Sequence, residues 1–344
     1  MAGFTEKTVL VADIGGTNSR FGLFFCNSAA VTCDDGLKLV RTVRFPTTGS
    51  RSTADMMRLL VETPGDDGGF FTPLSPFPVR VDAAVFAVPA LVPSTSPTPF
   101  APKDDVLHCP NMAWPIETAA VAAALGHAPV RFINDFVANG YACALLPQRI
   151  DAVTVLAGEE QPDFPRAVVG AGTGLGHCLI LPTTSPMVIG SEGGQALFPF
   201  MGEEEWALAR FMAEKRGTTQ SNGDMALGGS ALAHMYAFYT GAIVPPNVAS
   251  TLAAKNPSVL AMAARLYGRA VRQYVMNTLA FGGVFITGGL AANLPQVLLH
   301  PSFATELREG GAMSRLLETL PVRHVRNGDT GLWGAAVYAT YTTW

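Results

Sequence analysis

The stretch VLVADIGGTNSRFGLFF, Val9 to Phe25, decides the fold because it places a glycine-rich turn between two strands. Val9–Ile14 and Phe21–Phe25 are β-rich apolar runs, and the turn GGTNSR separates them, a pattern typical of a hairpin. In dinucleotide-binding loops and Walker-type loops the glycines open a helix instead. The pattern therefore distinguishes this chain from proteins with either of those loops.

The residues of this first turn have the chemistry to bind a phosphate group and a metal ion. Gly15 and Gly16 lack a Cβ, so backbone N–H groups can converge on an anion there. Thr17 and Asn18 add neutral hydrogen-bond donors. Asp13 has hard oxygen atoms that could hold Mg²⁺ directly or through a water. Because Asn and Gly are also the default residues of ordinary hairpin turns, this motif alone leaves a purely structural role open.

A second glycine-rich turn, GAGTGLG at residues 170–176, repeats this arrangement in the second half of the chain. Apolar runs at 167–170 and 177–181 predict strands on both sides of it. One such turn is a weak signal, because glycine-rich turns are common. Two of them, each joining two strands and each beginning one half of the chain, are much more specific.

The rest of the chain alternates predicted strands and helices, so the fold class is α/β, with mixed sheets covered by helices. Further strands are expected at residues 81–88, 152–156 and 284–287, and one more ends at Ile133. Helices are expected at residues 116–125, 203–214, 230–239, 258–278, 303–317 and 331–340. Residues 64–80 and 89–103 are rich in Pro, Gly and Ser and are expected to be surface loops.

Composition limits the classes of protein to which the chain can belong. Its 344 residues suit two domains, and 49% hydrophobic residues against 15% charged ones supply packed cores. The net charge of −4 and the lack of a Lys/Arg-rich run argue against a nucleic-acid partner. No apolar run approaches the roughly 20 residues that span a membrane. Five scattered cysteines without a CxxC pair fit a reducing compartment, so we expect a cytoplasmic protein.

Five motifs, in this order, resemble the bacterial glucokinases of the hexokinase, Hsp70 and actin superfamily. They are DIGGTN (13–18), FINDF (132–136), GAGTGLG (170–176), GSEGG (190–194) and FGGVFITGGL (281–290), and the resemblance runs from Val9 to Ala336. It implies a two-domain actin-like ATPase (ribonuclease H-like) fold with the active site in the cleft between the domains. It further implies a small domain of residues 1–145, on which a C-terminal helix at 328–344 packs back, and a large domain of residues 146–327.

The resemblance also implies an activity, the transfer of phosphate from ATP to D-glucose to give ADP and glucose 6-phosphate for glycolysis, with ATP and Mg²⁺ as cofactors. Asp135 would accept the proton of the sugar 6-hydroxyl group, and Asn134 would bond another hydroxyl. The phosphates of ATP would lie between the two glycine-rich turns, and the adenosine against Gly288 and Gly289. The implied ATP-binding residues are Asp13 (also near Mg²⁺), Gly15, Gly16, Thr17, Asn18, Gly172, Thr173, Gly174, Gly288 and Gly289.

Each of these motifs also has a simpler interpretation. Asn134 and Asp135 are residue types that commonly cap helices, and a cap can coexist with a role in binding sugar. Glu192 lies between glycines, where its carboxylate can accept two sugar hydroxyls or be a solvated turn residue. The pair Gly288–Gly289 could simply lead from a strand into a helix.

Two positions depart from the glucokinase pattern, and both are expected sugar contacts. Gln195 stands where the family has a histidine, and Asp224 is the best match to a glutamate of the family. The preferred hexose therefore stays open. The alternatives are a kinase for another hexose and a catalytically weak sugar-binding or sensor protein. Family members are often dimers, so the resemblance allows a homodimer.

Overall fold

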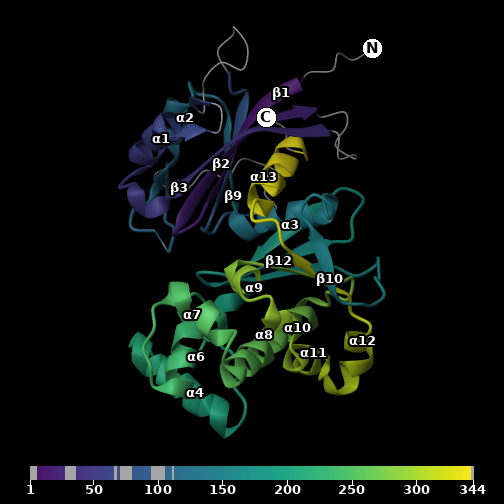
Figure 1. The fold of residues 1–344 in the computed structure, drawn as a ribbon. Helices are drawn as coiled ribbons and strands as arrows, with labels where there is room; N and C mark the ends of the chain where they lie inside the picture. The colour runs from purple at the N-terminus through teal and green to yellow at the C-terminus, as the bar shows by residue number, and fades with distance from the viewer. Residues whose placement is uncertain are drawn as a thin grey trace. The chain divides into compact units, whose positions relative to one another are not determined.

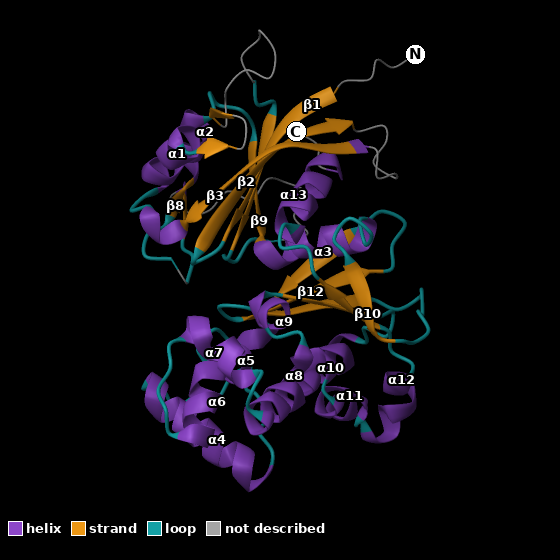
Figure 2. Cartoon of the chain, in the orientation of Figure 1, coloured by secondary structure: helices purple, strands orange, loops and turns teal. Residues whose placement is uncertain are grey.

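The chain divides into two compact units, one of residues 1–150 with 327–344 and one of residues 151–326. The computed structural model describes residues 6–27, 36–65, 68–69, 80–93, 105–110 and 112–341 (Figure 1). Most of the loops expected at 64–80 and 89–103 lie outside these described residues. The predicted α/β class is confirmed, because each unit is built on a mixed sheet with helices (Figure 2).

The first unit contains a five-stranded sheet in the order β3-β2-β1-β6-β9. Its strands are β1 (Glu6–Ile14), β2 (Asn18–Asn27), β3 (Leu37–Pro46), β6 (Ala83–Val88) and β9 (Val130–Asn134). The predicted hairpin is confirmed, since β1 and β2 pair antiparallel around the first glycine-rich turn. Strands β6 and β9 run parallel to β1, so the carboxyl ends of these three strands meet at one edge.

Helices cover both faces of this sheet (Figure 1). One core cluster joins alternate β1 residues such as Leu10 and Ile14 to Met56 of α1 (Thr53–Glu62) and Val121 of α2 (Thr118–Ala124). The other face of β1 and β6 meets α13 (Thr330–Tyr341), which packs closely on α3 (Asp135–Leu145). Since side chains alternate along a strand, Asp13 points to the face covered by α13.

The second unit repeats this strand pattern. Its six-stranded sheet has the order β10-β15-β14-β11-β12-β13, and its glycine-rich turn joins the antiparallel pair β11 and β12. Strands β14 and β15 continue parallel to β11, as β6 and β9 continue from β1. The strands are β10 (Ala152–Leu156), β11 (Arg166–Ala171), β12 (Leu175–Leu181), β13 (Met187–Ser191), β14 (Val284–Thr287) and β15 (Val322–Val325).

The helices of the second unit bury one face of its sheet in a single core cluster. They are α4 (Gly202–Arg216), α5 (Gly223–Leu227), α6 (Ala231–Thr240), α7 (Pro246–Ala253), α8 (Pro257–Thr278), α9 (Gly289–Asn293), α10 (Gln296–Leu299), α11 (Pro301–Arg308) and α12 (Ser314–Glu318). Short elements complete the chain: β4 (Pro64–Gly65), β5 (Gly68–Gly69), β7 (Val106–Leu107), β8 (Ile116–Glu117) and 3₁₀ turns at Thr47–Gly49, Gly193–Gln195 and Gly311–Met313.

The single helix predicted at 303–317 is wrong. The chain instead forms α11 and α12, separated by Gly310 and a short 3₁₀ turn. Glycine is a poor helix former, and Gly311 adopts a φ of 55°, in the left-handed region that ends a right-handed helix. Across the described part of the chain, no helix combines the length and apolar character needed to cross a membrane.

Candidate active site

The first glycine-rich turn is held in shape by a threonine from a neighbouring segment. Within the turn, the N–H of Gly15 donates to the carbonyl of Asn18 (2.9 Å). The hydroxyl of Thr47 donates to the carbonyl of Gly15 (2.7 Å) and lies 2.8 Å from the buried hydroxyl of Ser19. The N–H of Thr47 donates to the carbonyl of Thr17 (2.9 Å). These contacts fix the backbone of a turn that was predicted to bind phosphate.

Asp13 lies at the base of this turn, half-buried against the start of α13. A Cβ on Gly331 would come within 2.7 Å of the Asp13 carboxyl carbon, so only glycine lets the helix begin this close. Burial raises the pKa of Asp13, and the guanidinium of Arg20, 3.1 Å from the carboxylate, opposes that rise. Asp13 therefore offers a carboxylate ligand that burial disfavours in its charged form and that Arg20 partly stabilises.

Asp13 can contribute one carboxylate to a Mg²⁺ site. The described residues include no group of three or more His, Cys, Asp or Glu side chains that could hold a metal ion. Mg²⁺ commonly binds one or two carboxylates and completes its shell with water and substrate phosphates. One carboxylate beside a predicted phosphate-binding turn fits that coordination.

Asn134 and Asp135 lie where β9 ends and α3 begins. The side-chain oxygen of Asn134 accepts from the N–H groups of Phe136 (2.9 Å) and Val137 (3.2 Å), so Asn134 caps the helix. Its amide nitrogen donates to the carbonyl of Ala90 (3.3 Å). The capping role is confirmed, and Asp135 is the first, half-buried residue of α3.

The parallel strands bring Asp135 and Asp13 to the same edge of the first sheet. Asp13 pairs with Ala87 of β6, and Val88 of β6 pairs with Asn134. One strand thus separates β1 from β9, which puts the backbones of Asp13 and Ile133, two residues before Asp135, about 10 Å apart. The charge of Asp135 also acts on a neighbour, because burial and then Asp135 raise the pKa of the Cys109 thiol to about 12.

The second unit places the second glycine-rich turn next to Gly288 and Gly289. Gly288 has a φ of 91°, and a Cβ there would lie 2.5 Å from the carbonyl oxygen of Ala171. The hydroxyl of Tyr267, buried in α8, donates to the carbonyl of Thr287 (3.3 Å) and accepts from the N–H of Ala171 (3.4 Å). Tyr267 therefore ties the two predicted ATP-binding segments together, and no sequence motif marks it.

The three sugar-site candidates of the second unit also lie together. The side-chain nitrogen of Gln195 donates to one carboxylate oxygen of Asp224 (2.7 Å), and the N–H of Leu175 donates to the other (2.7 Å). Partial burial, and to a lesser extent the charge of Asp224, raises the pKa of Glu192. Glu192 precedes the 3₁₀ turn that carries Gln195.

A buried histidine lies beneath this group, and the sequence analysis missed it. The ring of His177 stacks on that of Tyr274 with centroids 4.4 Å apart, and its Nδ1 would lie 3.4 Å from a Cβ on Gly193. Burial lowers the pKa of His177 to about 4, so its imidazole is neutral near pH 7. Its position directly after the second glycine-rich turn is the signal that could have found it.

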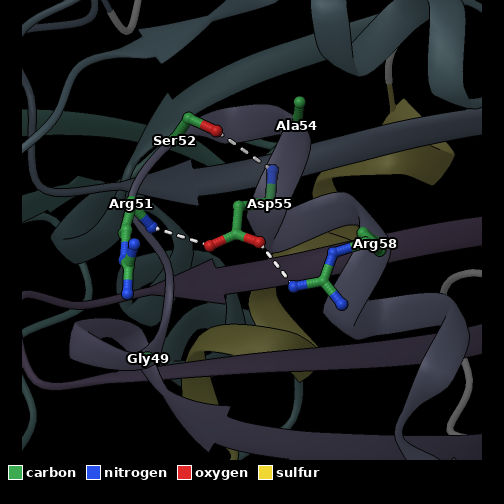
Figure 3. Close-up of a pocket in the computed structure, with 6 residues that line it drawn as sticks. All are labelled: Gly49, Arg51, Ser52, Ala54, Asp55 and Arg58. Atoms are coloured by element: carbon green, nitrogen blue, oxygen red, sulfur yellow. Dashed lines mark hydrogen bonds and ion pairs between the residues drawn. The ribbon is translucent and has the colours of Figure 1, made fainter.

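A surface pocket at the start of α1 contains none of the predicted site residues (Figure 3). The carboxylate of Asp55 there is already bonded, because it accepts from the backbone N–H of Arg51 (3.0 Å) and binds the guanidinium of Arg58 (2.6 Å). The pocket is lined by Gly49, Arg51, Ser52, Ala54, Asp55 and Arg58.

Solved structures of sugar kinases share this fold. A glucokinase from Balamuthia mandrillaris, solved in complex with glucose, aligns with a TM-score of 0.74 at 16% identity, over 98% of this chain and 94% of that one. A ROK family glucokinase from Streptomyces griseus, solved with glucose and AMPPNP, aligns with a TM-score of 0.58 at 18% identity, over 97% of this chain and 100% of that one.

Sequence comparison goes beyond the fold. This chain is 29% identical to a glucokinase of Xanthomonas campestris over an alignment 348 positions long. The alignment covers 97% of this chain and 95% of the relative. The family model described as Glucokinase matches residues 10–342, nearly the whole chain. The chain therefore belongs to the glucokinase family.

Proposed function

We propose that this protein transfers the γ-phosphoryl group of ATP to the 6-hydroxyl group of glucose in the cytoplasm, supplying glucose 6-phosphate to glycolysis. Membership of the glucokinase family makes it an ATP-dependent hexose kinase. The observation that carries the residue assignment is the shared sheet edge, where Asp13 is the penultimate residue of β1 and Asn134 is the last residue of β9. Ligands of open α/β sheets gather at the carboxyl ends of strands.

Asp135 is the proposed base. Phosphoryl transfer requires positioning and charge neutralisation, with an acceptor for the proton of the attacking hydroxyl. Asp135 is only half-buried, and its Oδ1 accepts from the N–H of Phe136 (2.9 Å), so the start of the helix orients the carboxylate. Asn134 keeps its side-chain oxygen on the cap, and one N–H of its amide donates to the carbonyl of Ala90, which leaves the second N–H as the donor for a sugar hydroxyl.

The phosphates of ATP are proposed to lie between the two glycine-rich turns, with Mg²⁺ on Asp13, and the adenosine to lie against Gly288 and Gly289. The metal, when bound, would neutralise charge on the transferred phosphoryl group. Glu192, Gln195 and Asp224 are the proposed sugar contacts of the second unit. The structures with glucose and with AMPPNP support these ligands here. An active site formed by both units and a homodimer stay predictions of the sequence.

The variant Asp135→Asn tests the assignment. It should lower kcat by about 10² to 10⁴, the usual contribution of a positioned general base, while ATP binding is retained. Exposed Asp105 of the same unit supplies the matched control Asp105→Asn, which should leave kcat unchanged. If Asp135→Asn keeps more than about a third of the kcat with unchanged folding, the base is another residue.

A substrate panel tests the choice of hexose. ADP release is measured with glucose, fructose, mannose, glucosamine and N-acetylglucosamine at equal concentrations. Glucose should give the highest kcat/KM. A higher value for another sugar would assign Gln195 and Asp224 to that sugar, and turnover of none would contradict the proposed activity.

A further inference from the structure

We propose that Asp224 is a positioning residue that locks the phosphate turn (residues 170–176) to the sugar turn (residues 190–195), so that both substrates depend on it. The inference rests on the proposed function only in naming what each turn binds. The lock itself consists of contacts within the second unit.

The carboxylate of Asp224 uses its two oxygens for the two turns. Oδ1 accepts from the N–H of Leu175, in the phosphate turn, and Oδ2 accepts from the side-chain amide of Gln195, in the sugar turn, both at 2.7 Å. Hydrogen bonds to an ionised acceptor are roughly twice as strong as neutral ones. One charged side chain therefore holds a backbone group of one turn and a side chain of the other.

The short helix that carries Asp224 is fixed to the same group. Asn222 caps α5, because its side-chain oxygen accepts from the N–H of Met225 (2.9 Å). Its amide nitrogen donates to the side-chain oxygen of Gln195 (3.1 Å). Gln195 is thus a donor to Asp224 and an acceptor from Asn222, and its amide orientation is determined by both.

Glycines leave the space that the carboxylate occupies. A Cβ on Gly174 would lie 2.9 Å from both oxygens of Asp224, and a Cβ on Gly194 would lie 3.2 Å from Oδ1. The same Cβ on Gly194 would come within 1.8 Å of the carbonyl oxygen of Leu175. The two turns therefore approach at backbone distance, and a shift of either one would be transmitted to the other.

The hydrogen-bond pattern allows a test in which the donor and acceptor are exchanged. In Asp224→Asn the amide oxygen can still accept from Leu175, but the new nitrogen faces the nitrogen of Gln195. In Gln195→Glu two carboxylates face each other. The double variant restores every bond, because the carboxylate at 195 accepts from the amide at 224 and from Asn222, and the total charge is unchanged.

Steady-state kinetics on the full chain measure the lock. Asp224→Asn and Gln195→Glu should each raise KM for ATP and for the hexose by about tenfold or more, because a charge-assisted bond is lost. The double variant should return both values to within about threefold of wild type, which is strong coupling between the positions. Asp163→Asn, at an exposed aspartate of the same unit, is the matched control.

Two results would overturn the inference. If Asp224 were only a sugar ligand, Asp224→Asn would raise KM for the hexose alone, and the double variant would not recover. Additive losses in the double variant would also contradict a lock.

Hydrogen exchange at the Leu175 amide separates the lock from the proposed activity. The amide should exchange slowly in wild type, at least about fivefold faster in Asp224→Asn, and slowly again in the double variant. This result is expected even if wild type phosphorylates no sugar in the panel, an outcome that would reject the proposed function alone. Unchanged exchange in Asp224→Asn would reject the lock.

Discussion

The two glycine-rich turns join the same kind of strand pair, yet different chemistry holds each one. The first is supported by a neutral hydroxyl, that of Thr47, 32 residues away in sequence from Gly15. The second is supported by a carboxylate, that of Asp224, 49 residues away from Leu175. In both cases the residue that fixes the turn lies outside the glycine-rich motif, so the motif alone does not determine the geometry.

The two turns differ in their charged groups, which indicates that they affect different kinetic parameters. The first turn begins with a carboxylate of its own, Asp13, which lies at the strand edge near Asp135. The second turn has no acidic residue in GAGTGLG, and the carboxylate beside it accepts hydrogen bonds from Leu175 and Gln195. We therefore expect changes at the first turn to act on kcat and changes at the second to act on KM.

Among changes that compare the two turns, the largest effect should come from Asp13→Asn. Loss of a group that stabilises developing charge costs about 10² to 10³ in kcat, and KM for the hexose should change little. Steady-state rates over a range of Mg²⁺ concentrations measure it. The contrast between the turns breaks down if Asp224→Asn lowers kcat as much as Asp13→Asn does.

Lowering the pH should reduce the unfolding free energy of the chain, because His177 next to the second turn is buried as a neutral imidazole. Its pKa of about 4 in the folded chain lies below the ordinary value of about 6.5, so only the unfolded chain binds this proton between those pH values. Stability is therefore lost as pH falls through this window, by about 3 kcal/mol in all. Urea unfolding from pH 7 to pH 4 should show a smaller loss in His177→Gln.

The exposed histidine His108 supplies the control for that experiment. His108→Gln should keep the full acid-dependent loss of wild type. An equal pH dependence in wild type and His177→Gln would mean that His177 takes up its proton without unfolding the unit.

At the first turn, Thr47→Val should cost about 1 to 3 kcal/mol of unfolding free energy. The change keeps the shape but leaves the carbonyl of Gly15 and the buried hydroxyl of Ser19 without this partner. Urea unfolding at pH 7 measures the cost, with the exposed neighbour Thr48→Val as the control. Equal stability of the two variants would show that other contacts support the turn.

The smallest expected effect is a pH shift at Glu192. Its pKa is raised mainly by burial and secondarily by Asp224, so its carboxylate is lost at a higher pH than usual as the solution is acidified. KM for the hexose should rise as the pH falls and Glu192 becomes protonated. Asp224→Asn removes one cause, so the midpoint should move to lower pH, and a midpoint moving upward would contradict this account.

The sequence predicted those features that local patterns determine. The two hairpins, the strands 152–156 and 284–287, and the long helix near 258–278 follow from apolar periodicity and turn residues. It missed β3 and α1, and it continued one helix through Gly310 and Gly311. The last error reflects glycine conformation, which overrides a periodic pattern. The signal for α1 is present in the sequence, because Ser52 caps the helix and Met56, Met57 and Leu60 form its buried face.

For the candidate site, the motifs located the turns but not the residues that support them. Thr47 and Tyr267 act through contacts with residues distant in sequence, and no sequence motif marks either of them. His177 directly follows the second turn, but its stacking on Tyr274 depends on the fold. Nothing in the sequence indicated that Gln195 contacts Asp224, although each residue was noted separately as a departure from the family pattern. Departures that contact one another in the fold are better interpreted as a pair.

The position of α13 has a consequence for folding during synthesis. This helix packs on β1, β6 and α3, with a Cβ on Gly334 excluded by the carbonyl of Ala138, 1.7 Å away. The first unit thus needs residues from both ends of the described chain, whereas residues 151–326 form a continuous segment. During synthesis, domains fold as units and earlier segments emerge first. We expect residues 151–326 to fold before the first unit is complete, because α13 leaves the ribosome after them.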